Sequence, residues 1–156
     1  MIVKSIVWPN EEATHAFAQG LAILLTARPG LANAFIELRG DLGAGKTTFV
    51  RHLLGALGVQ GRIKSPTYAV LEPYELASGL NIWHFDFYRF NDPDEWEEAG
   101  FRELFASPGL KLAEWAANAG PHIPQADLVI AIDTADSDVR CVTLTAMTDT
   151  GARLLP

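Results

Sequence analysis

The sequence is poor in cysteine, in positive charge and in long apolar runs. Cys141 is the only cysteine in 156 residues, so no internal disulfide can form, and a reducing, cytoplasmic location is expected. Twelve basic residues stand against nineteen acidic ones, which argues against a broad nucleic-acid-binding face because such a face needs clustered Lys and Arg. A role near RNA would therefore pass through a partner protein.

The apolar segments are too short to indicate a membrane protein. The most apolar window, AFAQGLAILLTA, has about a dozen residues, which is less than a bilayer-spanning helix needs. The N-terminal stretch MIVKSIVWPN is followed at once by polar residues, so we expect no signal peptide. The length and the apolar share of 49% suit one core, and a single domain over residues 1–156 is expected.

Apolar periodicity and turn residues predict an alternation of strands and helices. Helices are expected after the cap Asn10, from Thr47 to about Leu57, and over residues 91–105, where Gly100 would divide the last one. The predicted strands cover residues 2–8, 34–38, 67–76, 80–87, 110–115, 127–133 and 139–147. This order predicts an α/β protein with helices covering a sheet. Because the last strands follow one another without helices, part of the sheet is expected to be antiparallel.

Residues 39–50, RGDLGAGKTTFV, carry the most informative chemical signal. Gly40, Gly45, Lys46 and Thr47 satisfy the pattern G-x-x-x-x-G-K-[ST] between a predicted strand and a predicted helix. The glycines let backbone N–H groups converge on a phosphate, and the helix dipole acts at the same point. We expect Lys46 to reach the β- and γ-phosphates and the Thr47 hydroxyl to hold Mg²⁺. The predicted nucleotide contacts in this loop are Asp41, Leu42, Gly43, Ala44, Gly45, Lys46, Thr47 and Thr48.

A P-loop enzyme also needs an acid at the end of an apolar strand to fix Mg²⁺, and two strands offer one. Asp133 ends the segment DLVIAID, in which five apolar residues are unbroken. Asp86 ends LNIWHFD, which contains the polar residues Asn81 and His84. The apolar run favours Asp133, but the pattern leaves both acids open. His84 is interpreted as an ordinary half-buried histidine in preference to a support for the metal site.

Other functions of P-loop proteins find less support. The sequence has no N-K-x-D segment, so guanine specificity is not indicated. Residues 79–90 and 93–104 together contain two arginines, Arg89 and Arg102, whereas a small-molecule kinase usually places more positive charge around the transferred phosphate. A small metabolite kinase and a nucleotide-dependent binding module remain as alternatives to an ATP hydrolase.

Several blocks occur together in one order: GDLGAGKTTFVRHLLGALG, KSPTY, EPYEL, HFDFYRFNDPDE and LAEWAANAG. From residue 8 to about 133 the chain resembles the bacterial ATPase of tRNA threonylcarbamoyladenosine biosynthesis, the TsaE (YjeE) family. The resemblance implies a P-loop NTPase fold with a central, mostly parallel sheet, added antiparallel strands and helices on both faces. It assigns the metal-side acid to Asp86 in place of Asp133. It also identifies KSPTY as a mobile switch, in which Ser65 and Thr67 would sense the γ-phosphate.

The resemblance implies further site residues. Glu114 matches a second metal-side carboxylate, and Trp115 matches a neighbour of the nucleotide, although Ala116 stands where the family commonly has proline. Thr14 matches a threonine close to the nucleotide. Arg140 matches loosely a basic residue near the phosphates.

The resemblance also implies the activity. The expected protein is a Mg²⁺-dependent ATPase that is slow alone and is stimulated by the threonylcarbamoyl transferase and its companion subunit, TsaD and TsaB. ATP turnover would reset the transferase between cycles, with tRNA contacted only weakly or indirectly. The expected catalytic residues are Lys46, Asp86 and Thr67.

Overall fold

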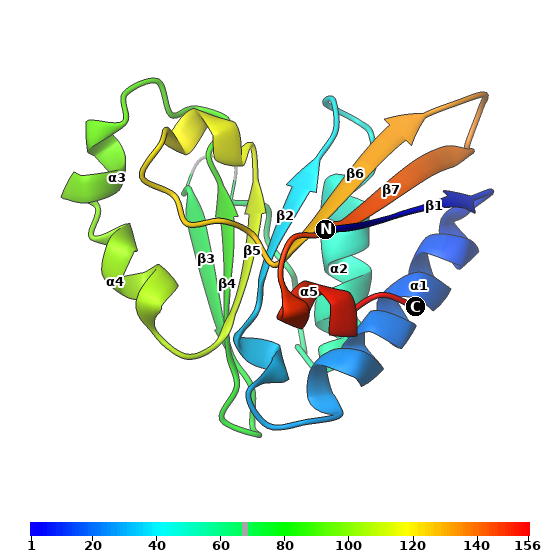
Figure 1. Ribbon diagram of the computed structural model, residues 1–156, viewed down its shortest axis with the longest axis horizontal. Helices are drawn as coiled ribbons and strands as arrows, with labels where there is room; N and C mark the ends of the chain where they lie inside the picture. The colour runs from blue at the N-terminus through cyan, green and yellow to red at the C-terminus, as the bar shows by residue number, and fades with distance from the viewer. Residues whose placement is uncertain (67–68) are drawn as a thin grey trace.

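A computed structural model describes residues 1–66 and 69–156, and Figure 1 shows one mixed sheet with helices on both of its faces. In the described residues the sheet has seven strands, in the order β1-β7-β6-β2-β5-β4-β3. The strands are β1 (Ile2–Trp8), β2 (Phe35–Arg39), β3 (Leu71–Glu75), β4 (Asn81–Asp86), β5 (Leu110–Glu114), β6 (Leu128–Thr134) and β7 (Arg140–Ala146). The helices are α1 (Glu11–Thr26), α2 (Lys46–Leu57), α3 (Asp94–Glu98), α4 (Phe101–Ala106) and α5 (Asp149–Arg153), with 3₁₀ turns η1 (Leu31–Asn33) and η2 (Ala116–Ala119).

The centre of the sheet is parallel and its edges are antiparallel. Strands β6, β2, β5 and β4 run parallel to one another, whereas β7 and β1 extend one edge and β3 extends the other in antiparallel fashion. Parallel neighbours need long crossovers, and antiparallel neighbours can be joined by a short turn. The prediction of a helix-covered sheet with antiparallel additions is therefore confirmed.

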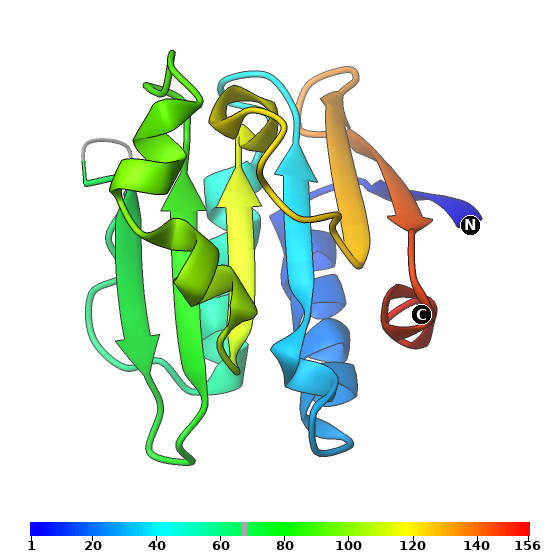
Figure 2. The same cartoon turned by 60° about the vertical axis from the view of Figure 1, so that its left-hand side comes forward.

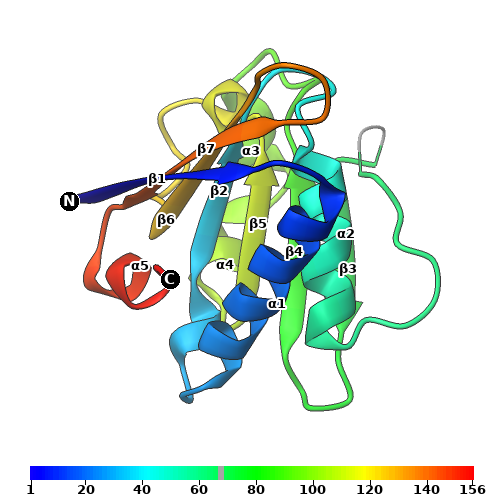
Figure 3. The same ribbon diagram turned by 90° about the vertical axis from the view of Figure 1, so that its right-hand side faces the viewer.

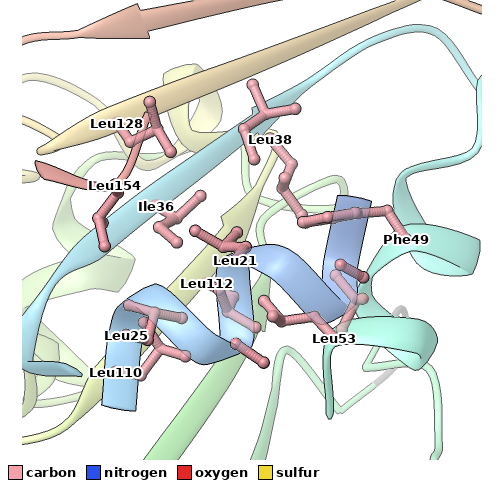
Figure 4. Packing of buried hydrophobic residues seen from close by; sticks show 14 of the residues in the cluster. Leu21, Leu25, Ile36, Leu38, Phe49, Leu53, Leu110, Leu112, Leu128 and Leu154 are labelled. Carbon is pink, nitrogen blue, oxygen red and sulfur yellow. The ribbon is translucent and has the colours of Figure 1, made fainter. Parts of the chain in front are cut away.

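The helices form two layers. Figure 2 shows α3 and α4 in front of β4 and β5, with α1 and α2 behind the sheet, and in Figure 3 α1 and α2 lie side by side. Leu21 and Leu25 of α1 pack toward Ile36 of β2, beside Phe49 and Leu53 of α2 (Figure 4). Burying a side chain of this size contributes about 2 kcal/mol relative to exposure. The opposite face holds an aromatic cluster that includes Phe85, Phe87, Trp96 and Phe101.

Local signals in the sequence place most element boundaries. The side chain of Asn10 accepts a hydrogen bond from the backbone N–H of Ala13, as expected for the cap of α1. Gly100 separates α3 from α4 as predicted. Strand β3 does not include residues 69, 70 and 76 of the predicted range 67–76, and residues 67 and 68 are not described. Short elements such as η1 and α5 were not predicted, because one or two turns give no measurable apolar period. Within the described residues, no helix has both the length and the apolar character needed to cross a membrane.

Candidate functional site

The glycine-rich loop lies at the carboxyl end of a central parallel strand. Strand β2 ends at Arg39 and α2 begins at Lys46, so residues 40–45 turn between them. A Cβ atom on Gly40 would lie 2.6 Å from the carbonyl oxygen of Ile132, so only glycine allows the loop to start this close to β6. Gly45 has a φ of 113°, which also favours glycine, and it leads directly into α2. The free N–H groups of the first turn of α2 therefore face the loop, as in phosphate sites at helix N-termini.

Two carboxylates converge beside this loop. Asp86 ends β4 and Glu114 ends β5, and the two residues are direct partners in the parallel pairing of these strands. Because β5 also pairs with β2 in parallel, the two acids and the loop all lie at the carboxyl ends of the central strands. Asp86 is 5% exposed and Glu114 is 3% exposed. The backbone N–H of Tyr88 donates to Oδ1 of Asp86 at 2.9 Å, which fixes one oxygen of that carboxylate.

Residues of the loop and the two acids line one hollow of about 260 Å³, which we term the phosphate hollow. Its lining consists of Leu42, Gly43, Ala44, Gly45, Lys46, Thr47, Thr48, Asp86, Tyr88, Glu114, Trp115 and Arg140. Tyr88 was not singled out from the sequence, although it lies inside the block HFDFYRF that carried the resemblance.

Lys46 is held inside the phosphate hollow. Its Nζ donates to the carbonyl oxygen of Gly40 and lies 3.9 Å from the centroid of the Trp115 ring. Burial lowers the pKa of Lys46 below its usual value, whereas the carboxylates of Glu114, Asp86 and Asp41 act in the opposite direction. An anion bound in the hollow would therefore also favour the charged ammonium.

Trp115 adopts a backbone conformation that is costly for a non-glycine residue. Its φ of 57° and ψ of 38° lie in the left-handed region. This conformation ends β5 and starts η2 at Ala116, so the indole turns back over Lys46. The ring of Tyr88 lies 5.1 Å from the ring of Trp115, which completes an aromatic wall of the phosphate hollow. Ala116, which departs from the family pattern, is buried.

His84 is fully buried, in contrast to the half-buried residue expected from the sequence. Its Nε2 lies 2.6 Å from Oε2 of Glu114, and its Nδ1 has no hydrogen-bond partner in the described part of the chain. The prediction that His84 is half-buried is therefore wrong. The contact joins His84 directly to one of the two acids of the site.

A second hollow of about 240 Å³ adjoins the loop on another side. It shares Ala44, Gly45, Thr48 and Arg140 with the phosphate hollow, and is otherwise lined by Trp8, Asn10, Glu11, Thr14 and Asp138. Nε of Arg140 donates to the carbonyl oxygen of Ala44 at 2.8 Å, so Arg140 lies against the loop between the two hollows. Thr14 is buried in this second hollow. Trp8 and Asp138 had no distinguishing signal in the sequence.

Three other residues considered from the sequence lie outside both hollows. Asp41 and Ser65 line neither of them. Asp133 is exposed and pairs with Cys141 in the β6–β7 ladder, and it lines neither hollow. Thr67 lies outside the described residues.

Oxygen donors dominate the acidic wall of the phosphate hollow. Thr47 offers a hydroxyl, and Asp86 and Glu114 offer carboxylates. Mg²⁺ prefers this kind of ligand and usually combines one or two carboxylates with waters and substrate phosphates. In residues 1–66 and 69–156, no group of three or more His, Cys, Asp or Glu side chains is arranged to hold a metal ion. The donors present fit Mg²⁺ bound together with a phosphate.

Comparisons with known proteins point to one family. The family model described as threonylcarbamoyl adenosine biosynthesis protein TsaE matches residues 8–142. A Haemophilus influenzae protein named tRNA threonylcarbamoyladenosine biosynthesis protein TsaE is 39% identical over 147 residues, which are 94% of this chain and 92% of that protein. The Bacillus subtilis protein of the same name is 37% identical over 147 residues, which are 93% of this chain and 88% of that protein.

A solved structure is also similar to this chain. The crystal structure of Bacillus subtilis YdiB matches with a TM-score of 0.73 and 33% sequence identity, over 99% of this chain and 93% of that one. The expected P-loop NTPase fold is therefore confirmed.

Proposed function

Because the chain belongs to the TsaE family, we propose that it is a Mg²⁺-dependent ATP hydrolase of tRNA threonylcarbamoyladenosine biosynthesis. It would act in the cytoplasm as one P-loop domain over residues 1–156. The observation that carries the proposal is the meeting of Lys46 and the loop amides with Asp86 and Glu114 in one hollow. Lys46 and the amides offer positive charge to a chain of phosphates, and the two carboxylates offer negative charge to the cation that accompanies it.

Binding of the triphosphate rests on groups that the loop already presents. The N–H groups at the start of α2 and Lys46 would neutralise the β- and γ-phosphates. Lys46 would exchange the carbonyl oxygen of Gly40 for phosphate oxygens while keeping its contact with Trp115. Arg140 and Thr14 line the adjoining hollow, which we assign to the rest of the nucleotide.

Hydrolysis would proceed by attack of water on the γ-phosphorus. The new P–O bond forms to the water oxygen, the bond from the γ-phosphorus to the bridging oxygen breaks, and ADP leaves with that electron pair. Mg²⁺, held by Thr47, Asp86 and Glu114, would neutralise the charge that develops on the phosphate oxygens. Ser65, which does not line the phosphate hollow, and Thr67, which lies outside the described residues, are proposed to approach the γ-phosphate when nucleotide is bound.

Slow turnover without a partner is part of the proposal. Of the arginines in the described part of the chain, only Arg140 lines the phosphate hollow, and it is engaged with the carbonyl oxygen of Ala44. A second cationic group supplied by another protein can raise phosphoryl transfer by about 10³-fold or more. We propose that the threonylcarbamoyl transferase and its companion subunit, TsaD and TsaB, stimulate the hydrolysis.

The test is phosphate release from ATP and Mg²⁺ with and without the transferase pair. Stimulation by the pair is expected, and its absence would exclude the proposed role. Transfer of labelled phosphate to a metabolite would indicate a kinase. ATP-dependent binding to the pair that is undiminished in Asp86→Ala, together with unstimulated hydrolysis, would indicate a binding module.

A further inference from the structure

A third hollow, of about 810 Å³, lies where the segment after α2 passes that helix. Figure 3 shows this segment leaving the C-terminal end of α2 and running back alongside the helix toward its N-terminal end. Arg51 of α2 lines the hollow together with Arg62, Lys64 and Ser65 of the segment, and Glu72 of β3 lies in its wall. We call it the basic hollow.

The three cations of the basic hollow have no ion-pair partner among the described residues. Arg51, Arg62 and Lys64 are exposed, and none of them forms an ion pair with an acidic side chain of residues 1–66 or 69–156. Elsewhere Arg39 and Arg102 pair with Glu37 and Glu97. In a chain with a formal charge of −7, three free cations around one concavity mark a site that attracts negative charge.

The shape and surroundings of the basic hollow favour a protein partner over RNA. An RNA backbone is bound by positive charge spread along many phosphates, and the net charge of −7 repels a polyanion at longer range. Glu72 in the wall repels a phosphate and a carboxylate alike, but it can pair with a basic residue on a protein surface of mixed charge, which RNA does not offer. The guanidinium groups of Arg51 and Arg62 can bind the carboxylates of such a surface in bidentate fashion.

We infer that the basic hollow docks an acidic surface segment of the protein partner that stimulates hydrolysis, an inference that rests on the proposed function. Arg51 follows Thr47 by four residues, so both lie on the same side of α2, one turn apart. Ser65, a proposed sensor of the γ-phosphate, lines the same hollow. A partner held here contacts both the helix that carries the phosphate loop and the segment that carries Ser65.

A charge-reversal pair tests this docking. Arg51→Glu combined with Arg62→Glu should weaken binding to the transferase pair by about tenfold or more, because like charges then face each other. The matched control is Arg28→Glu combined with Arg153→Glu, two exposed arginines outside the basic hollow whose reversal gives the same net charge. Basal phosphate release and the thermal unfolding midpoint should stay near wild type in both double variants. The neutral pair Arg51→Gln and Arg62→Gln should give an intermediate loss.

The outcomes separate this inference from the proposed function. Wild-type affinity for the transferase pair in the Arg51→Glu and Arg62→Glu variant would overturn the docking site alone. An equal loss in the control pair would assign the effect to net charge and also overturn it. If that variant loses tRNA binding, measured by fluorescence anisotropy, but still binds the transferase pair, the ligand of the basic hollow is RNA and the docking of an acidic protein segment is refuted. Failure of the wild-type chain to bind the transferase pair would overturn the proposed function itself.

Discussion

Nζ of Lys46 lies 3.9 Å from the centroid of the Trp115 ring, so the ammonium group of the glycine-rich loop forms a cation–π contact with the indole. An ammonium over an aromatic face is attracted by the ring quadrupole, by about 0.5–2 kcal/mol depending on desolvation. The contact also places the indole where it reports any movement of Lys46. The left-handed backbone of Trp115 makes this arrangement possible.

We expect nucleotide binding to change the fluorescence of Trp115. A phosphate that draws Lys46 away from the carbonyl oxygen of Gly40 alters the charge above the ring. Titration of ATP and Mg²⁺ should therefore change the emission of the wild type, and the change should be smaller in Trp115→Phe, where Trp8 of the adjoining hollow still contributes. Trp83→Phe removes a tryptophan outside the phosphate hollow and should retain the signal. An undiminished change in Trp115→Phe would refute the assignment.

Asp86→Asn should impair hydrolysis more than Asp133→Asn. Asp86 lines the phosphate hollow, whereas Asp133 is exposed and lies outside it. Removing the metal-side charge should lower kcat by about 100-fold, in the range found for groups that stabilise developing charge. Asp133→Asn should stay within about twofold of the wild type, as expected for a surface substitution away from the site. Equal losses in the two variants, measured by phosphate release, would refute the choice of acid.

The pattern of the sequence favoured Asp133 for a physical reason. An unbroken apolar run reports that a strand is buried on both faces, and β6 is such a strand. It does not report where the acids of the site lie. The end of β6 also adjoins the loop, because β6 is a direct neighbour of β2, but Asp133 there is exposed and lines neither hollow. Asp86 and Glu114, at the ends of β4 and β5, line the phosphate hollow. Only the family resemblance pointed to Asp86.

Contacts between strands were likewise beyond the sequence. His84 and Glu114 are 30 residues apart, and they meet because β4 pairs with β5 in a register that places Asp86 opposite Glu114. No local periodicity encodes that register. The loop residues were predictable because G-x-x-x-x-G-K-[ST] specifies its own backbone shape, independent of distant partners.

His84 should act as a positioning residue for Glu114. Glu114 is proposed to hold Mg²⁺, and groups that hydrogen-bond a metal ligand typically affect metal affinity or activity by about 10–100-fold. In His84→Leu, which cannot hydrogen-bond Glu114, we expect kcat to fall by about tenfold, the Mg²⁺ concentration for half-maximal activity to rise, and the KM for ATP to change little.

The conservative variant His84→Gln provides the control. Its side-chain amide can reach the position of Nε2 and should restore much of the activity that His84→Leu loses. Equilibrium Mg²⁺ binding in the presence of ADP gives a readout independent of turnover. Equal losses in both variants, with unchanged Mg²⁺ binding, would show that His84 only fills the core.

Lys111 provides a test of pH dependence away from the site. It is 2% exposed on β5, its Nζ donates to the carbonyl oxygen of Ser107, and burial lowers its pKa, with Asp127 acting in the opposite direction. Between the lowered value of the folded state and the usual value of about 10.5, the unfolded chain binds more protons, so stability rises with pH. The free energy of unfolding of the wild type should therefore increase relative to that of Lys111→Met as the pH is raised toward 10.5.

Urea titrations at several pH values measure this difference in the free energy of unfolding. The control is Lys4→Met, which alters a lysine on the exposed edge strand β1 and should show no such trend. A difference between the wild type and Lys111→Met that is constant or falls with pH would mean that the burial of Lys111 costs nothing in the charged state.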